Sequence, residues 1–287
     1  MTWRLRVSHM THYQYGGTVT TSYNEARMTP LSLVGQTTID ARFDVRPSVR
    51  TFRYWDYWGT MVHAFDLHLP HDELTITSTA VVETSEWQPT TDSVGWNALA
   101  REDELDRWCE LLRPSQYVPA DEALAVQAAI LRSSGSSEAT DPLTRAVEAN
   151  AFVHDHMDYR KGSTTVATSA PEAYAAGTGV CQDFAHVLLG ILRSMGIPCR
   201  YVSGYLYSEK PAGAAAGTTS TGQSHAWVEA WVGDWLGLDP THGGFVGPQH
   251  VTVARGRDYA DVTPLKGIFT GAPVESLDVQ VELTRIA

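Results

Sequence analysis

A glycine-bounded apolar segment in the second half of the chain is the feature that most restricts its fold. Five apolar side chains recur there at helical spacing, namely Phe184, Leu188, Ile191, Leu192 and Met195. This period predicts an α-helix with one face in a core. Gly196 follows as a stop signal, with a proline two residues later. The sequence therefore predicts a helix that begins near residue 181.

Cys181 stands in or just before the first turn of this helix. Unpaired backbone N–H groups point outward at such a position and the helix dipole favours negative charge. A thiolate is stabilised there, and the same N–H groups can hold an oxyanion. The alternative is a small buried hydrophobe, because free cysteine is among the most buried residue types.

The other two cysteines lack these features. Cys109 lies in a charged, amphipathic helical stretch and Cys199 opens a probable strand, so both are predicted to be structural. Three cysteines without a CxxC pair argue against a disulfide framework or a zinc site made of thiolates.

Two residues that can activate a thiol follow on a predicted hairpin. Alternation places His225 on one face of a strand, and Gly233 with the next residue is a turn signal before a strand that ends at Asp239. A two-residue loop would place Asp239 on the face opposite to His225. A three-residue loop or a bulge gives the one-residue offset that joins them, unless one of the two lies just outside the ladder. Cysteine, histidine and aspartate are the nucleophile, base and orienting group of a catalytic triad.

The residues around these positions resemble the bacterial transglutaminase-like proteins of the papain-like cysteine superfamily. The segments that carry the resemblance are residues 179–186, 196–206, 224–229 and 238–241, together with residues 9–15 and 56–59 near the N-terminus and 253–262 near the C-terminus. The resemblance implies Cys181 as nucleophile, His225 as base and Asp239 as orienting residue. The chain departs from the family pattern at His242, where asparagine is expected.

An α+β fold in two units is expected. Residues 1–87 alternate like strands and predict an N-terminal antiparallel β domain. Residues 88–287 are predicted to form a papain-like, transglutaminase-like α+β core with a C-terminal extension, its nucleophile helix packed on an antiparallel sheet. Helical stretches are expected near residues 100–113, 121–133 and 138–157, after a linker at about 86–98.

Composition excludes several kinds of partner. A net charge of −12 argues against nucleic acid and against an anionic membrane surface. The chain has no apolar run long enough for a membrane span, and its start lacks a signal-peptide pattern, so a cytoplasmic location is expected. His154 and His156 stand two apart on a predicted helix and make a poor chelate. No metal and no cofactor are predicted, and the oligomeric state is left open.

Three further residues are candidate substrate contacts: Gln182, Trp58 and Trp227. Trp58 belongs to an aromatic cluster at residues 52–59, which either packs between the two units or forms one wall of a substrate cleft. The loop at 210–222, rich in small residues, is either a plain solvent loop or a flap over the site.

These observations predict acyl transfer through a thioester, with a peptide or protein amide as substrate. Hydrolysis by a protease or amidase is favoured, because nothing identifies an amine site and water is always available. The alternatives are a protein-glutamine gamma-glutamyltransferase and a non-catalytic module that binds a peptide with the triad retained.

Overall fold

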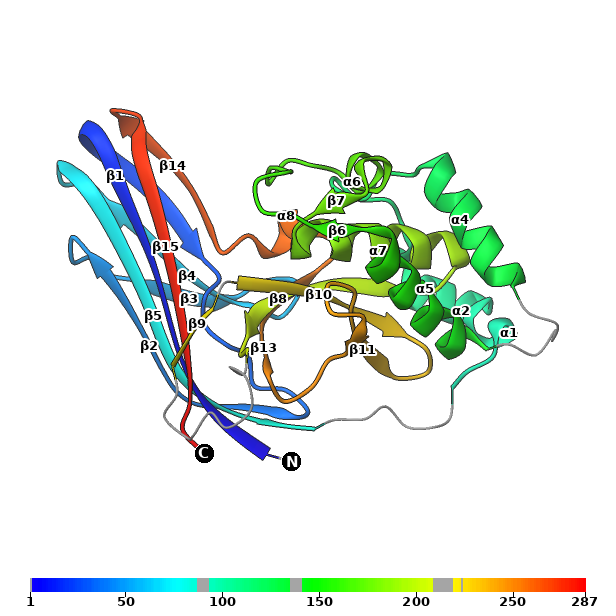
Figure 1. Ribbon diagram of the computed structural model, residues 1–287. Helices are drawn as coiled ribbons and strands as arrows, with labels where there is room; N and C mark the ends of the chain where they lie inside the picture. Colours follow the sequence, from blue (N-terminus) through cyan, green and yellow to red (C-terminus); the bar gives the residue numbers. More distant parts are fainter. Residues whose placement is uncertain (1, 87–92, 135–140, 209–218, 223) are drawn as a thin grey trace.

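The computed structural model describes residues 2–86, 93–134, 141–208, 219–222 and 224–287. It confirms the α+β class. A long, curved antiparallel sheet stands beside a second unit, in which helices cover one face of a smaller sheet (Figure 1). Residues 87–92 of the predicted linker lie outside the described ranges, and residues 96–98 belong to a short helix instead. Most of the 210–222 loop also lies outside the described ranges.

The first sheet contains strands from both ends of the chain. Its order is β2-β5-β1-β15-β9, with β4 and β14 also paired to β1, and β3 paired to β4. The strands are β1 (Thr2–Ala26), β2 (Gln36–Arg46), β3 (Phe52–Trp55), β4 (Met61–Leu67), β5 (His71–Ser85), β9 (Thr219–Gly222), β14 (Leu265–Gly271) and β15 (Val274–Arg285). Part of the predicted C-terminal extension therefore completes the N-terminal sheet, and Figure 1 shows the two termini side by side.

The second unit is built on the antiparallel order β12-β11-β10-β8-β13. Its strands are β8 (Cys199–Leu206), β10 (Ser224–Trp231), β11 (Trp235–Asp239), β12 (Gly244–Phe245) and β13 (His250–Gly256). The helices are α1 (Trp96–Leu99), α2 (Glu102–Arg107), α3 (Cys109–Leu112), α4 (Glu122–Ser133), α5 (Pro142–His156), α6 (Ala170–Ala176), α7 (Cys181–Met195) and α8 (Tyr259–Val262). A short parallel pair, β6 (Asp158–Tyr159) and β7 (Thr178–Gly179), precedes α7. None of the described helices is both long and apolar enough to span a bilayer.

Helix α7 is more buried than the sequence pattern predicted. Its residues from Gln182 to Arg193 are all buried, because α4, α5 and α6 cover it on one side and β8 and β10 on the other. The buried polar members have partners. The guanidinium of Arg193 donates to the Leu111 carbonyl at 3.2 Å and to Ser115 Oγ at 3.1 Å. The helix is therefore a central element rather than a surface helix with one apolar face.

The two units share a continuous core. Leu5, Val7 and Val82 of the first sheet pack in the same buried cluster as α7 and the second sheet. Polar contacts also cross the boundary: His9 Nδ1 lies 2.9 Å from Tyr205 Oη. The side-chain amide of Gln36 donates to the Thr252 carbonyl and accepts from the Thr252 N–H, both at 2.8 Å.

The aromatic cluster at residues 52–59 also contacts the second unit. Tyr57 donates to Glu110 of α3 at 2.6 Å, and the Arg257 guanidinium lies 5.8 Å from the ring centre of Trp58. These contacts fit the predicted role in packing between the units.

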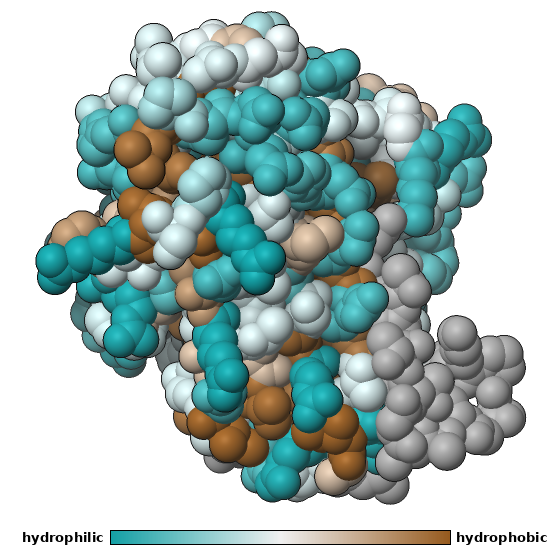
Figure 2. Space-filling model, turned by 90° about the vertical axis from the view of Figure 1, so that its left-hand side faces the viewer, coloured by the Kyte–Doolittle hydropathy of each residue, from teal (hydrophilic) through white to brown (hydrophobic). Residues whose placement is uncertain are grey.

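The outward face of the first sheet is mixed in character. Exposed apolar side chains such as Ile39, Leu277 and Val279 lie on its strands. Figure 2 views the molecule from that side and shows apolar residues interspersed with hydrophilic ones. Such scattered apolar residues are normal on a solvated surface.

Gly204 in the middle of β8 should tolerate no side chain. A Cβ there would meet the Val251 carbonyl oxygen and come within 2.5 Å of the Trp227 ring. Gly204→Ala is expected to lower the free energy of unfolding by about 3 kcal/mol, the upper end of overpacking costs. Gly244→Ala is the control, because a Cβ there has no neighbour within 4 Å. Denaturant unfolding measures both, and equal effects would contradict the packing argument.

Candidate active site

The start of α7 is fixed by a side chain from its own first turn. The Asp183 carboxylate accepts hydrogen bonds from the Val180 N–H at 2.7 Å and from Thr164 Oγ1 at 2.6 Å. A Cβ on Gly179 would lie 2.5 Å from the Asp183 Cβ, so glycine is needed beside this carboxylate. Cys181 is the first residue of α7, as predicted.

First-turn N–H groups are available beside the thiol. The N–H groups of Asp183 and Phe184 donate to the Val180 carbonyl at 2.9 and 3.2 Å. The N–H groups of Cys181 and Gln182 precede the first such bond, where a helix has no intrahelical acceptor to offer. An anion beside Cys181 would meet these donors together with the positive end of the dipole.

The hairpin has the offset that the sequence analysis required. Trp231 pairs with Trp235 across a three-residue loop, and Val228 pairs with Leu238. Continuing this register by one residue places Asp239 beside Trp227, on the face that carries His225. His225 Nε2 lies 2.8 Å from Asp239 Oδ2. The one-residue offset is thus confirmed.

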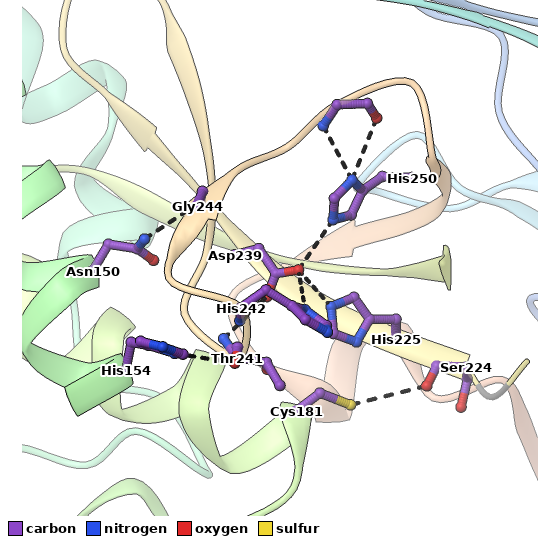
Figure 3. A network of polar contacts seen from close by, with 11 residues as sticks. Asn150, His154, Cys181, Ser224, His225, Asp239, Thr241, His242, Gly244 and His250 are labelled. Atoms are coloured by element: carbon purple, nitrogen blue, oxygen red, sulfur yellow. Dashed lines mark hydrogen bonds and ion pairs between the residues drawn. The ribbon is translucent and has the colours of Figure 1, made fainter. Parts of the chain in front are cut away.

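The imidazole of His225 lies between the carboxylate and the thiol. Figure 3 shows its ring with Asp239 on one side and Cys181 on the other. The Cys181 Sγ is 3.9 Å from the carbonyl oxygen of Ser224, the residue before His225. Burial alone would lower the pKa of His225, but hydrogen bonds to Asp239 and to Cys181 outweigh it and raise the pKa to about 9. The structure therefore favours an imidazolium in contact with the thiol.

Asp239 is almost fully buried and accepts from three imidazoles. Besides His225, its Oδ2 lies 2.9 Å from His242 Nδ1 and 3.1 Å from His250 Nε2. Its Oδ1 accepts from the Thr241 N–H at 3.0 Å. Burial raises the pKa of this carboxyl, but the hydrogen bonds from the three histidines outweigh burial and hold it well below the usual range.

His250 was not identified from the sequence. It lies on β13, eleven positions after Asp239, and no local pattern marks it. The Gly247 N–H donates to its Nδ1 at 3.1 Å, so its Nε2 carries the proton given to Asp239. Burial lowers the pKa of His250 against the opposing effect of Asp239, which leaves it neutral. His242 occupies the position where the family pattern has asparagine, and that departure is the signal that marked it.

The same cluster offers metal ligands. The donor atoms of His225, Asp239 and His250 all lie within 4.8 Å of one another. Their mutual hydrogen bonds account for this convergence without an ion. His154 and His156, which the sequence analysis judged a poor chelate, bond to different backbone carbonyls, those of Thr241 and Tyr174. That no metal is required stays a prediction.

The candidate substrate contacts lie in different environments. The Gln182 amide donates to the Val166 carbonyl at 3.2 Å and so positions the preceding loop. Trp227 is fully buried, with its ring edge-on to His250 at 5.2 Å. A fully buried side chain offers no surface to a substrate, and the indole instead packs beside His225 and His250. Trp58 packs with Arg257 and Tyr57, and its role in binding substrate stays a prediction.

The other cysteines differ from Cys181 in environment. Cys199 is completely buried, which raises its pKa to about 11. Cys109 is the first residue of the four-residue helix α3, whereas the sequence pattern placed it inside a longer helix. The two short helices are separated at Trp108, whose φ of −109° and ψ of 15° lie outside the helical region.

Comparisons with known proteins agree on the fold. Residues 131–240 match the transglutaminase-like superfamily and residues 5–83 match the bacterial transglutaminase-like N-terminal region. An uncharacterized protein of Mycobacterium leprae is 45% identical over 285 residues, 99% of this chain and 100% of that protein. A candidate cysteine protease from Cytophaga hutchinsonii, solved by crystallography, is 20% identical with a TM-score of 0.75 and covers 99% of this chain and 98% of its own. A protein-glutamine gamma-glutamyltransferase of Pseudomonas aeruginosa is 30% identical over 155 residues, 51% of this chain and 22% of that protein.

The stability that His225 contributes should depend on pH. Its pKa is raised from 6.5 to about 9 in the folded protein, so its contribution is fully present below pH 6.5 and is lost as the pH rises through 9. His225→Ala should therefore cost more at pH 6 than at pH 10, by on the order of 3 kcal/mol. Denaturant unfolding of both proteins at pH 6, 8 and 10 measures this difference. A cost that does not change with pH would contradict the imidazolium assignment.

Proposed function

This chain belongs to the transglutaminase-like superfamily with a bacterial transglutaminase-like N-terminal region, and we propose that it is a cysteine enzyme that cleaves amide bonds through a thioester. The proposal rests on one observation. A buried imidazole lies between a thiol at a helix start and a buried carboxylate, to which it is hydrogen-bonded at 2.8 Å (Figure 3). This is the arrangement that nucleophilic catalysis by cysteine requires.

The reaction proceeds in two steps. The Cys181 thiolate attacks the amide carbonyl carbon and forms the carbon–sulfur bond, while the carbonyl oxygen becomes an oxyanion held by the Cys181 N–H and a second donor. The carbon–nitrogen bond then breaks as His225 gives its proton to the departing amine. Water, deprotonated by His225, attacks the thioester carbon. The carbon–sulfur bond then breaks, which releases the acid and restores the thiolate and imidazolium pair.

Asp239 keeps the imidazole in one orientation during both steps. It accepts from Nε2, so the opposite nitrogen of His225 faces the sulfur (Figure 3). A carboxylate that already accepts from His242 and His250 has little freedom to rotate away. The imidazolium is thereby stabilised in the position where it can donate.

Hydrolysis is favoured over transfer to an amine. Water is always present, and no residue among those described identifies a site for a lysine-type amine. The gamma-glutamyltransferase of Pseudomonas aeruginosa matches half of this chain, which keeps transfer as the second candidate. Both reactions share the thioester and differ only in the group that resolves it.

A peptide library incubated with and without a primary amine distinguishes the two reactions. Mass spectrometry should report cleavage or deamidation in both samples, whereas predominant incorporation of the amine would favour transfer. Cys181→Ala should lower either turnover by at least ~10³-fold, as for other catalytic triads. Cys109→Ser is the matched control and should keep the wild-type rate. Unchanged turnover in Cys181→Ala would end the proposal.

Thiol alkylation separates an enzyme from a module that only binds peptides. Iodoacetamide should modify Cys181 near neutral pH faster than Cys109 or Cys199, since thiolate is the reactive form and His225 stabilises it. His225→Gln should slow the modification of Cys181 alone. Site-resolved mass spectrometry over time gives the three rates. Three slow rates, unaffected by His225→Gln, would favour the binding module.

A further inference from the structure

A pocket of about 480 Å³ lies on the face of the second sheet that is turned away from α7. One wall comes from the first sheet, at the start of β2 and the end of β5, and includes Val34 and Gln36. The other wall comes from β8, β10, β11 and β13. The volume lies within the range of small-molecule sites, roughly 300–1,000 Å³. The thiol of Cys181 is not among its lining groups.

The floor of this pocket holds two guanidinium groups and one carboxylate. The Arg200 Nε and Nη2 donate to one oxygen of Glu229 at 2.6 and 2.5 Å, and the Arg255 Nη2 donates to the other at 2.8 Å. The three side chains are 12–19% exposed. Two positive charges thus share one negative charge in a largely buried place.

Among the three floor residues, Glu229 compensates only one of the two positive charges. The Arg255 Nε is buried without a hydrogen-bond partner. Burial lowers the pKa of Arg200 to about 10; Glu229 opposes this change and Arg255 adds to it. Asp234 also lines the pocket, but among the described residues it pairs with neither arginine, and its carboxylate accepts from the Trp235 N–H instead. A bound anion would compensate the guanidinium charge that Glu229 leaves over.

The pocket also reaches the hydrogen-bond network around Asp239. His250 lines it, and so does Gly247, whose N–H fixes the tautomer of His250. The Nε2 of the same ring donates to Asp239, which in turn holds His225. A molecule in the pocket would contact the residues that set the position of the carboxylate.

We propose that this pocket binds a small organic molecule with one carboxylate, held by Arg255 and Arg200, and that its occupancy changes the reactivity of Cys181 through His250 and Asp239. One negative charge on the ligand balances the net positive charge of Arg200, Arg255 and Glu229. The planar fork of a guanidinium matches the two oxygens of a carboxylate. The indole of Trp235, which stacks on Arg200 at 3.7 Å, supplies an apolar surface beside the charge.

Calorimetry on the full chain tests the binding. Acetate, butyrate and benzoate are compared with ethanol, butanol and benzyl alcohol, which have the same carbon skeletons without the negative charge. At least one carboxylate should bind ten-fold or more tightly than its alcohol. Arg255→Gln keeps a donor for Glu229 and should weaken binding at least ten-fold, whereas Arg42→Gln, on exposed β2, should not. Cys181→Ala should still bind the carboxylate at least ten-fold more tightly than its alcohol, so this result does not depend on the proposed catalysis.

A second pair of variants guards against a folding defect in Arg255→Gln. Val34 is 77% exposed at the pocket wall. Val34→Glu should bind the carboxylate more weakly than Val34→Gln, because the two differ in charge and hardly in size. Absence of carboxylate binding, equal binding of acids and alcohols, or tighter binding of inorganic phosphate would each overturn the carboxylate assignment.

The proposed coupling between the pocket and the thiol of Cys181 is tested by a separate measurement. Saturation with the bound carboxylate should change the rate at which iodoacetamide modifies Cys181 by at least two-fold in the wild type and leave it unchanged in Arg255→Gln. Alkylation measures the thiol directly and needs no substrate, so the result is independent of whether amides are cleaved. A rate that is unaffected in the wild type would overturn the coupling.

Discussion

The buried carboxylate of Asp239 is the interaction on which the arrangement of the site depends. It joins β10 through His225, the turn after β11 through His242 and Thr241, and β13 through His250. A buried charge without such partners costs several kcal/mol, whereas one that accepts several hydrogen bonds is stabilised. The carboxylate therefore holds three strands in register and at the same time orients one imidazole.

The thiol is positioned by a separate set of contacts at the start of α7. Packing of α7 on the sheet brings the thiol to the imidazole that Asp239 holds. Asp183 caps α7 and fixes Cys181 as its first residue. Helix α7 lies on β8 and β10 with almost its whole surface buried, so its first residue has a fixed place along the sheet. The side chain of His225 then spans from the carboxylate to the sulfur. Neither set of contacts includes both the thiol and the imidazole, and the core between them sets their separation.

Local patterns in the sequence were sufficient to predict the parts of the site that depend on residues close together in the chain. The helix start at Cys181 follows from glycine and apolar-period signals within a few residues. The turn before Asp239 is also marked locally, but its length is not, and the one-residue offset was expected only from the catalytic interpretation. His250 and the cluster of Arg200, Glu229 and Arg255 could not be found in this way, because strand pairing between distant segments creates them. The same reason explains β14 and β15: their return to β1 is decided by pairing across more than 200 residues. The burial of α7 on all sides likewise could not be predicted. It depends on α4, α5, α6, β8 and β10, which the helical period of the α7 sequence does not specify.

Strand β13 connects the chemistry of the second unit to the first sheet. His250 and Thr252 stand two apart on this strand, so their side chains leave the same face. His250 bonds to Asp239, while the backbone of Thr252 exchanges two hydrogen bonds with Gln36 at the start of β2. A displacement of the first sheet against the second would thus act on the strand that supports the carboxylate. The N-terminal unit is for this reason part of the structure that positions the imidazole, and a core without it would leave β13 unsupported on that face.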